Sequence, residues 1–243
     1  MKVELLNLGW MTAPAGLWRQ GDAKPERPLR LPVPAYLIET ETERILVDTG
    51  LHPDAVADPS DRYGEGSSIG FFGLEQEESL TDQVDLGTLT KVILTHLHFD
   101  HAGGLSLIPD SVPVVVQRAE WEAGQNHAEI EQNFFLPRDY AEAPEDLVLV
   151  DGDHDLLGDG SILLLSTPGH TVGHQSVQVG DLVIGADVAL FAGSLDDHRF
   201  PAFGYSREQQ VESAERLREL RDASLVVQPG HDPEVLRPGQ LAT

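Results

Sequence analysis

A cluster of four potential metal ligands most constrains what this chain can fold into. His96, His98, Asp100 and His101 fall within six positions, directly after the apolar run at residues 92–94. Neutral imidazoles and carboxylates are ligands for zinc-like divalent ions. The apolar run predicts a buried strand, which places the four side chains where rigid scaffold gives way to loop. Histidines are also common on ordinary surfaces and in loops, but four ligands at this alternating spacing favour a metal site.

Composition limits the other possibilities. The chain has 243 residues, 40% of them hydrophobic and spread along its whole length, so we expect one globular domain spanning residues 1–243. No apolar run reaches membrane-spanning length, and no partner membrane is expected. Cysteine is absent, so any metal must be held by histidines and carboxylates; a cytoplasmic location fits this. The net charge of -25 opposes nucleic-acid binding and indicates an acidic surface.

The order of apolar and polar segments predicts a mixed α/β domain. A helix is expected at residues 206–222, with Ser206 as N-cap and Gln209 three residues on. Two shorter helices are expected at residues 79–89 and 118–125. The proline-rich residues 25–34 predict a loop or an edge segment near the mouth of the site, and residues 52–79 predict a long loop of the lid or binding type. Strands are expected at residues 3–8, 35–39, 44–47, 92–94, 112–116, 147–150, 162–165, 176–179, 182–184 and 225–228.

Further potential ligands also follow apolar runs. His170 and His174 follow the run at residues 162–165, Asp187 follows residues 182–184, and His231 follows residues 225–228. Each of these patterns is weak alone, because a Gly-His step is more often a simple turn. Together they repeat the same layout as His96, which predicts one site assembled at one edge of a sheet.

These motifs resemble the metallo-β-lactamase superfamily. The resemblance rests on H-x-H-x-D-H at residues 96–101, Gly-His at 169–170 and 230–231, the intervening Asp187, and Asp-Thr-Gly at 48–50. It implies an α/β fold of the four-layered αβ/βα sandwich type, with a metal site at the edge of two facing sheets. Within the superfamily, residues 96–104, 167–176, 201–204 and 229–232 are most similar to the N-acyl-homoserine lactonase group.

The resemblance implies two divalent metal ions and assigns their ligands. His96, His98 and His170 would bind one ion, Asp100, His101 and His231 would bind the second, and Asp187 would bridge both. Three protein ligands for each ion and a shared carboxylate leave an open position for water, as a catalytic site requires. His174 and Asp48 are expected to orient these ligands. Zinc suits the ligand set, and manganese, iron and cobalt fit it as well.

Other members of the superfamily fit less well. Di-iron flavoproteins carry a glutamate where this chain has His98, and the commonest β-lactamases use a cysteine ligand, which is absent here. RNA-processing members act on a polyanion, which the negative charge opposes. A metal-binding protein without hydrolase activity is a further alternative, but all seven ligand positions are filled.

The implied activity is hydrolysis of a small-molecule lactone, most of all an N-acyl-homoserine lactone (quorum quenching), by attack of a metal-bridging hydroxide. Asp100 would act as the catalytic proton carrier. Other lactones, aryl esters and organophosphates are alternative substrates for the same site. A homodimer is common among such lactonases. Side chains expected to contact substrate are Phe71, Phe72, Phe203, Leu190 and Tyr205, with Phe134, Phe135 and Phe191 as further candidates.

Leu190 marks a departure from the lactonase group. That group usually carries a tyrosine three residues after the bridging aspartate, where it contacts the substrate carbonyl, and this chain has Leu190 there. Tyr205, Tyr63 or His198 would then take over that contact, or the substrate would differ.

Overall fold

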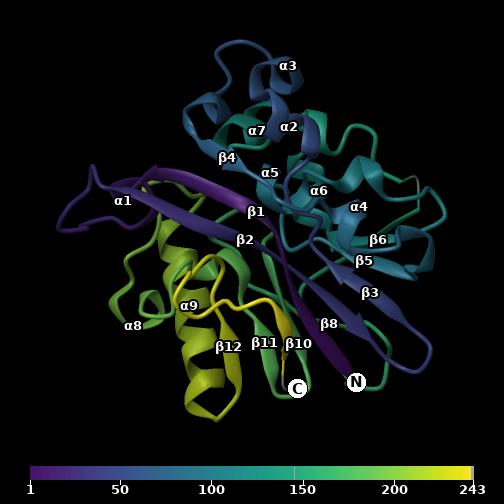
Figure 1. The fold of residues 1–243 in the computed structure, drawn as a ribbon. Coiled ribbons are helices and arrows are strands. Elements are labelled where there is room, and N and C mark those ends of the chain that lie inside the picture. The colour runs from purple at the N-terminus through teal and green to yellow at the C-terminus, as the bar shows by residue number, and fades with distance from the viewer. Residues whose placement is uncertain (145, 242–243) are drawn as a thin grey trace.

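Two β-sheets face each other and form the centre of the molecule (Figure 1). The computed structural model describes residues 1–144 and 146–241. The larger sheet has the order β13-β1-β2-β3-β5-β6-β7, with β4 paired to β1, and the smaller has the order β12-β11-β10-β9-β8. The strands of the larger sheet are β1 (Lys2–Pro14), β2 (Pro28–Glu39), β3 (Arg44–Val47), β4 (Gly73–Glu75), β5 (Lys91–Ile93), β6 (Val114–Gln117), β7 (Leu147–Val150) and β13 (Gly239–Leu241). Those of the smaller are β8 (His154–Asp155), β9 (Ile162–Ser166), β10 (Gln175–Val179), β11 (Leu182–Ile184) and β12 (Val226–Gln228).

Helices cover the outer face of each sheet. The α-helices over the larger sheet or beside its edge are α1 (Ala15–Trp18), α2 (Pro53–Ala57), α3 (Pro59–Tyr63), α4 (Leu80–Gln83), α5 (Phe99–Ala102), α6 (Arg118–Ala123) and α7 (His127–Asn133). The smaller sheet is covered by α8 (Ser194–Asp197) and α9 (Arg207–Asp222), and Figure 1 shows α9 beside β12. Short 3₁₀ helices complete the described structure: η1 (Ser68–Phe71), η2 (Leu86–Thr88), η3 (Leu105–Leu107), η4 (Pro137–Asp139) and η5 (Ala186–Val188).

Alternation along the strands explains the layers. In β3, Ile45 and Val47 point into the core between the sheets, whereas Leu46 points into the core beneath the helices. The same alternation in β9 sends Leu164 between the sheets and Leu165 toward α9. Because both faces of these strands are covered, the sequence shows continuous apolar runs instead of alternation. The predicted four-layered αβ/βα sandwich is confirmed by this arrangement.

Most predicted elements are present. The helix predicted at residues 206–222 is α9, and the Ser206 side chain accepts a hydrogen bond from the Gln209 backbone N–H, as an N-cap should. The helix predicted at residues 79–89 is split into α4 and η2, and that predicted at 118–125 is α6. No helix in the described ranges is both long enough and apolar enough to cross a membrane.

The structure corrects two loop predictions. Residues 28–34, predicted as a loop or an edge segment, are not a loop but begin β2, and they pair on one side with β1 from Pro14↔Pro28 to Asn7↔Pro34. Prolines are tolerated there because β2 pairs with β3 only from Tyr36 onward, so the missing N–H groups face no second neighbour. Residues 52–79, predicted as a long loop, contain α2, α3, η1 and β4. Proline at the first position of α2 and α3, with His52 and Asp58 as caps, starts these short helices.

Candidate metal centre

All seven predicted metal ligands lie where strands end, at one edge of the facing sheets. The loop after β5 carries His96 and His98, and α5 follows it directly with Asp100 and His101. The remaining three ligands follow β9, β11 and β12, and all seven side chains are buried: His96, His98, Asp100, His101, His170, Asp187 and His231. β11 and β12 run parallel, so their carboxyl ends bring Asp187 and His231 to the same place.

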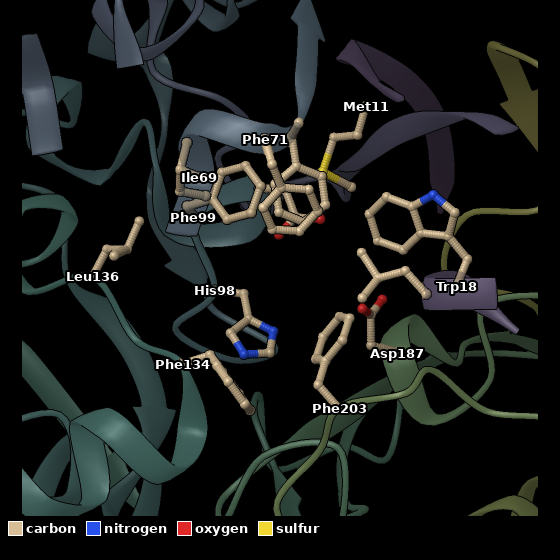
Figure 2. Close-up of a pocket in the computed structure, with 13 residues that line it drawn as sticks. Met11, Trp18, Ile69, Phe71, His98, Phe99, Phe134, Leu136, Asp187 and Phe203 are labelled. Carbon is tan, nitrogen blue, oxygen red and sulfur yellow. The ribbon is translucent and has the colours of Figure 1, made fainter. Parts of the chain in front are cut away.

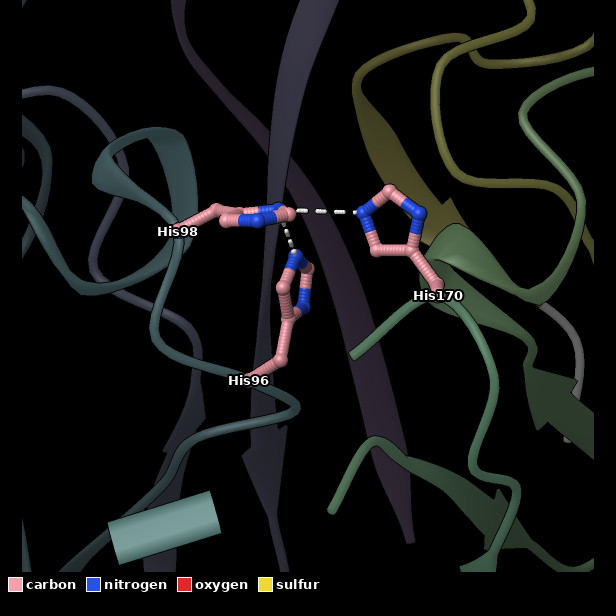
Figure 3. Close-up of side chains that lie close together, drawn as sticks. All are labelled: His96, His98 and His170. Atoms are coloured by element: carbon pink, nitrogen blue, oxygen red, sulfur yellow. Dashed lines mark hydrogen bonds between the residues drawn. The ribbon is translucent and has the colours of Figure 1, made fainter. Parts of the chain in front are cut away.

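His96, His98 and His170 form a first group. The Nε2 atoms of His96 and His170 each lie 3.0 Å from Nδ1 of His98, and Figure 3 shows the three rings converging. The ligand atoms of the group lie within 4.8 Å of one another. These residues can hold one metal ion.

Asp100, His101 and His231 form a second group. Oδ2 of Asp100 lies 3.5 Å from Nε2 of His101 and 3.4 Å from Nε2 of His231, and the two Nε2 atoms are 3.3 Å apart. This group has the spacing to hold a second ion.

Asp187 lies between the two groups and presents one oxygen to each. Its Oδ2 atom is 3.2 Å from Nε2 of His170, and its Oδ1 atom is 3.1 Å from Nε2 of His231. Gly230 permits this placement, because a Cβ atom there would approach Oδ1 of Asp187 to 2.5 Å. The geometry is that of a carboxylate able to bridge two ions.

Backbone carbonyl groups bind the outer ring nitrogens of two histidines and so determine which nitrogen faces the centre. Nε2 of His98 donates to the Asn133 carbonyl at 2.7 Å, and Nδ1 of His231 donates to the Pro32 carbonyl at 2.7 Å. In a neutral imidazole with one nitrogen protonated, the other nitrogen carries a lone pair. His98 Nδ1, and His231 Nε2 when that ring is neutral, therefore turn lone pairs inward, as metal ligands do.

Atoms that face the middle of the centre lack suitable hydrogen-bond donors within the described part of the protein. Oδ1 of Asp187 is buried without a hydrogen-bond partner among the described residues. A buried polar atom left in this state costs about 1–3 kcal/mol. Nδ1 of His98 also lies 3.0 Å from a ring nitrogen of each of two other histidines, although its one lone pair can accept only one hydrogen bond. Divalent cations at the two groups would satisfy both features, so the residues present fit a dinuclear metal centre.

Asp48 supports the second group and the strand that leads to it. Its Oδ2 atom accepts from Nδ1 of His101 at 2.8 Å, and its Oδ1 atom accepts from the Thr95 backbone N–H at 2.7 Å. Asp48 adopts a φ of 63°, in the left-handed region that non-glycine residues seldom occupy. The strained turn after β3 thus aims a carboxylate at the back of His101.

His174 supports the bridging aspartate. Its Nε2 atom accepts from the Asp187 backbone N–H at 3.1 Å, and its Nδ1 atom donates to the Thr167 hydroxyl at 2.9 Å. Burial lowers the pKa of His174 to about 3, so the ring is neutral and can accept. The hydrogen bond from the Asp187 backbone thus supports the predicted orienting role of His174.

Charge is divided unevenly between the two groups. Burial lowers the pKa of His98 to about 3, in the first group. In the second, burial alone would lower the pKa of His101, but Asp100, Asp187 and Asp48 together raise it well above its ordinary value. The second group also contains a carboxylate of its own, Asp100, which the first group lacks, and this favours a cation there.

An apolar pocket opens onto the metal centre. It has a volume of about 170 Å³, and Figure 2 shows His98, Asp187 and Phe203 facing it together. The lining residues are Met11, Leu17, Trp18, Ile69, Phe71, Phe72, His98, Phe99, Asp100, Phe134, Leu136, Asp187 and Phe203. The centre is thus connected to a space that suits an acyl chain.

The predicted substrate contacts divide into two sets. Phe71, Phe72, Phe203 and Phe134 line the pocket. Leu190 and Tyr205 are not among its described lining residues, and Leu190 is packed in the core beneath the helices. Of the other candidates, Phe135 is buried in that core beside His98, and Phe191 lines a separate surface hollow.

Sequence reasoning missed Glu120, which lies in α6 and is fully buried. Burial raises the pKa of Glu120 to about 7, although hydrogen bonds from Leu97, Gly173 and Thr171 act in the opposite direction. Leu97 lies between two ligands and Thr171 follows a third, so Glu120 connects both loops of the first group. A lone glutamate at the start of an amphipathic segment carries no signal in one sequence that distinguishes it from a surface residue.

Comparison with known proteins places the chain in a family. The family model described as Metallo-beta-lactamase superfamily matches residues 29–231. An N-acyl homoserine lactonase from Bacillus cereus is 32% identical over 219 residues, which cover 85% of this chain and 83% of that protein. An N-acyl homoserine lactonase from Rhizobium radiobacter is 27% identical over 221 residues, covering 84% of this chain and 83% of that protein.

A solved structure agrees with these relatives. An N-acyl homoserine lactone hydrolase with the product N-hexanoyl-L-homoserine at its catalytic metal center superposes with a TM-score of 0.81. It is 27% identical and covers 96% of this chain and 94% of that chain. The matched span includes all seven clustered ligands, from His96 to His231. The chain belongs to the metallo-beta-lactamase superfamily.

Proposed function

We propose that this protein is a dinuclear-metal hydrolase that opens lactone rings, with N-acyl-homoserine lactones as its substrates. The observation that carries the proposal is Asp187, whose two oxygens face two separate ligand groups at the floor of an apolar pocket. The lactonase relatives support the choice of substrate. Zinc is the proposed ion, since histidine and carboxylate ligands suit it, with manganese, iron and cobalt as alternatives.

Two bound divalent ions would lower the pKa of a water molecule and polarise a carbonyl oxygen. The protein's own residues position the lactone for that chemistry. The ring-opening step forms one C–O bond from water, breaks the ring C–O bond and delivers a proton to the departing ring oxygen. Asp100 lines the pocket as well as the second group, so its carboxylate is placed to carry that proton.

The pocket walls suit a hydrocarbon chain attached to the lactone. Phe72 lies between Trp18 and Phe99, with ring centroids 5.3 and 5.6 Å away, and so forms part of a continuous aromatic wall. Phe134 and Phe203 pack against each other on another part of the lining, with their ring centroids 5.8 Å apart. Burying a methylene group here stabilises the complex by about 0.8 kcal/mol. Longer acyl chains should therefore bind more tightly until the pocket is full.

A panel of substrates tests the proposed function. It should contain N-acyl-homoserine lactones of several chain lengths, simple γ- and δ-lactones, an aryl ester and a phosphotriester. We expect the acyl-homoserine lactones to give the highest kcat/KM. Faster turnover of the aryl ester or the phosphotriester would contradict the substrate assignment and support the alternative hydrolase.

The Leu190→Tyr variant tests whether that position limits catalysis. Leu190 is 2% exposed, and its backbone carbonyl accepts from the His231 N–H at 2.9 Å. A larger side chain in such a packed site typically costs about 1–3 kcal/mol of stability. We expect a lower Tm and no gain in kcat/KM for N-hexanoyl-homoserine lactone. A clear gain would show that residue 190 reaches the substrate.

The Asp139→Asn variant tests how the pocket wall is held. The carboxylate of Asp139 accepts from Arg62 at 2.9 Å and from the Tyr63 hydroxyl at 3.0 Å, and so ties α3 to the segment after Leu136. Ile69 and Phe72 follow α3, and they line the pocket. Loss of this buried ion pair should loosen the wall and raise KM for long acyl chains more than for short ones. Equal KM changes at every chain length would contradict this.

A further inference from the structure

Glu120 connects the two loops that supply the first ligand group. Its Oε1 atom accepts from the Leu97 backbone N–H at 2.9 Å. Its Oε2 atom accepts from the Thr171 hydroxyl at 2.9 Å and from the Gly173 backbone N–H at 2.8 Å. Leu97 stands between His96 and His98.

The helix that carries Glu120 is seated closely against the His170 loop. A Cβ atom at Gly173 would approach the Glu120 backbone nitrogen to 2.3 Å, so only glycine allows this contact. The two loops come from different sheets, because one follows β5 and the other follows β9. The carboxylate of Glu120 is thus a direct side-chain link between the two halves of the fold.

A carboxylate is specifically suited to this link. Both of its oxygens are acceptors, and both are used by donors from opposite loops. A glutamine at this position would keep one acceptor oxygen and replace the other with an NH₂ group. That NH₂ group would face a backbone N–H, either that of Gly173 or that of Leu97, and two donors cannot form a hydrogen bond. The neutral isostere therefore keeps the shape of the side chain and loses one side of the link.

We propose that Glu120 is a positioning residue that sets the spacing of His98 and His170 and thereby retains the ion held by His96, His98 and His170. The proposal rests on the two-metal centre of the proposed hydrolase. Glu120 does not line the pocket as described, so it acts through the ligands and not on the substrate. Residues that orient ligands in this way typically change metal affinity by about 10–100-fold when removed.

The experiment measures metal content after a timed chelator challenge, well below the Tm of each variant. We expect Glu120→Gln to lose one of its two ions about 10–100-fold more readily than the unaltered protein. Asp139→Asn is the matched control, because Asp139 is equally buried and hydrogen-bonded but bonds neither loop of the first group. It should keep both ions, even if its Tm falls as far as that of Glu120→Gln.

A double variant identifies which ion is lost. Asp100→Asn weakens the second group, so Glu120→Gln combined with Asp100→Asn should retain neither ion if Glu120 serves the first group. A double variant that keeps one ion would contradict the assignment. Glu120→Gln with the metal retention of the unaltered protein would overturn the proposal entirely.

A milder variant covers the case in which Glu120→Gln does not fold. Thr171→Val removes one hydrogen bond to Glu120 and keeps the shape of the side chain. It should lose the same ion to the chelator faster than the unaltered protein does, but less so than Glu120→Gln. Metal loss at the rate of the unaltered protein would contradict the proposal. Lactone hydrolysis by the unaltered protein is recorded in parallel. Two bound ions without lactone hydrolysis would defeat the proposed function while leaving the Glu120 test decisive.

Discussion

Replacing Asp187 with alanine is expected to release both metal ions and reduce lactone hydrolysis by about 10³-fold or more. The reason is geometric: Oδ2 lies 3.2 Å from Nε2 of His170, and Oδ1 lies 3.1 Å from Nε2 of His231. Without this carboxylate, each group loses an anionic ligand, and four neighbouring imidazoles lose the charge that faces them. Metal analysis of the purified variant, together with kcat/KM for N-hexanoyl-homoserine lactone, measures both effects.

An exposed aspartate provides the control for this variant. Asp196 pairs with Arg221 on the surface, and Asp196→Ala should leave metal content and turnover as they are. If Asp187→Ala still held two ions, Asp187 would not be the carboxylate that joins the two groups.

The Asp100→Asn variant is expected to weaken one ion selectively and to cut turnover by about 10²-fold or more. Oδ2 of Asp100 faces the Nε2 atoms of His101 and His231, and the same carboxyl lines the pocket. The amide has no negative charge for the ion and cannot carry the proton to the leaving oxygen. We therefore expect a lower kcat even after metal is resupplied in excess.

Two measurements separate the roles of Asp100. Metal content at rising free metal concentration reports on its role as a ligand, and kcat at saturating metal reports on its role in proton transfer. A variant with two ions and near-normal turnover would defeat both roles. Restoration of full kcat by added metal would leave Asp100 as a ligand only.

The metal centre was predictable because each ligand directly follows an apolar run. The repeated layout predicted that His96, Asp187 and His231 would converge at one edge of a sheet. In the structure β5 belongs to the larger sheet and β11 and β12 to the smaller one, and the site lies at the shared edge of both. The assignment of individual oxygens of Asp187 to each group required coordinates. The single-domain organisation and the possible homodimer stay predictions.

The errors have physical causes that single residues illustrate. Pro32 and Pro34 suggested a loop, but they lie where β2 pairs with β1 alone among the described strands. No second strand there needs a hydrogen bond from the N–H groups that proline lacks. Residues 52–79 are dominated by turn-forming residues, and the cap-and-proline pairs His52-Pro53 and Asp58-Pro59 are the local signals of the short helices. Glu120 was missed because its partners are distant in sequence, and burial of a carboxylate is visible only after the fold is known.

Substrate contacts were the least predictable part of the site. Phe72 and Phe203 line the pocket, whereas Leu190 is enclosed by core side chains although it is only three residues from Asp187. Distance along the chain does not determine which face of a loop a side chain occupies. The pocket walls come from β1, α1, η1 and the segments around Phe134 and Phe203, which only the assembled fold brings together.

Lactone hydrolysis is expected to need two ions, held by the two groups that Asp187 joins. Its most direct test is a metal titration of the chelator-treated protein, with the rate of N-acyl-homoserine lactone opening recorded against the number of ions bound per chain. Full activity should be reached only when two ions are bound and should vanish again on chelation. Full activity with one ion per chain, or with none, would show that hydrolysis does not require a dinuclear centre.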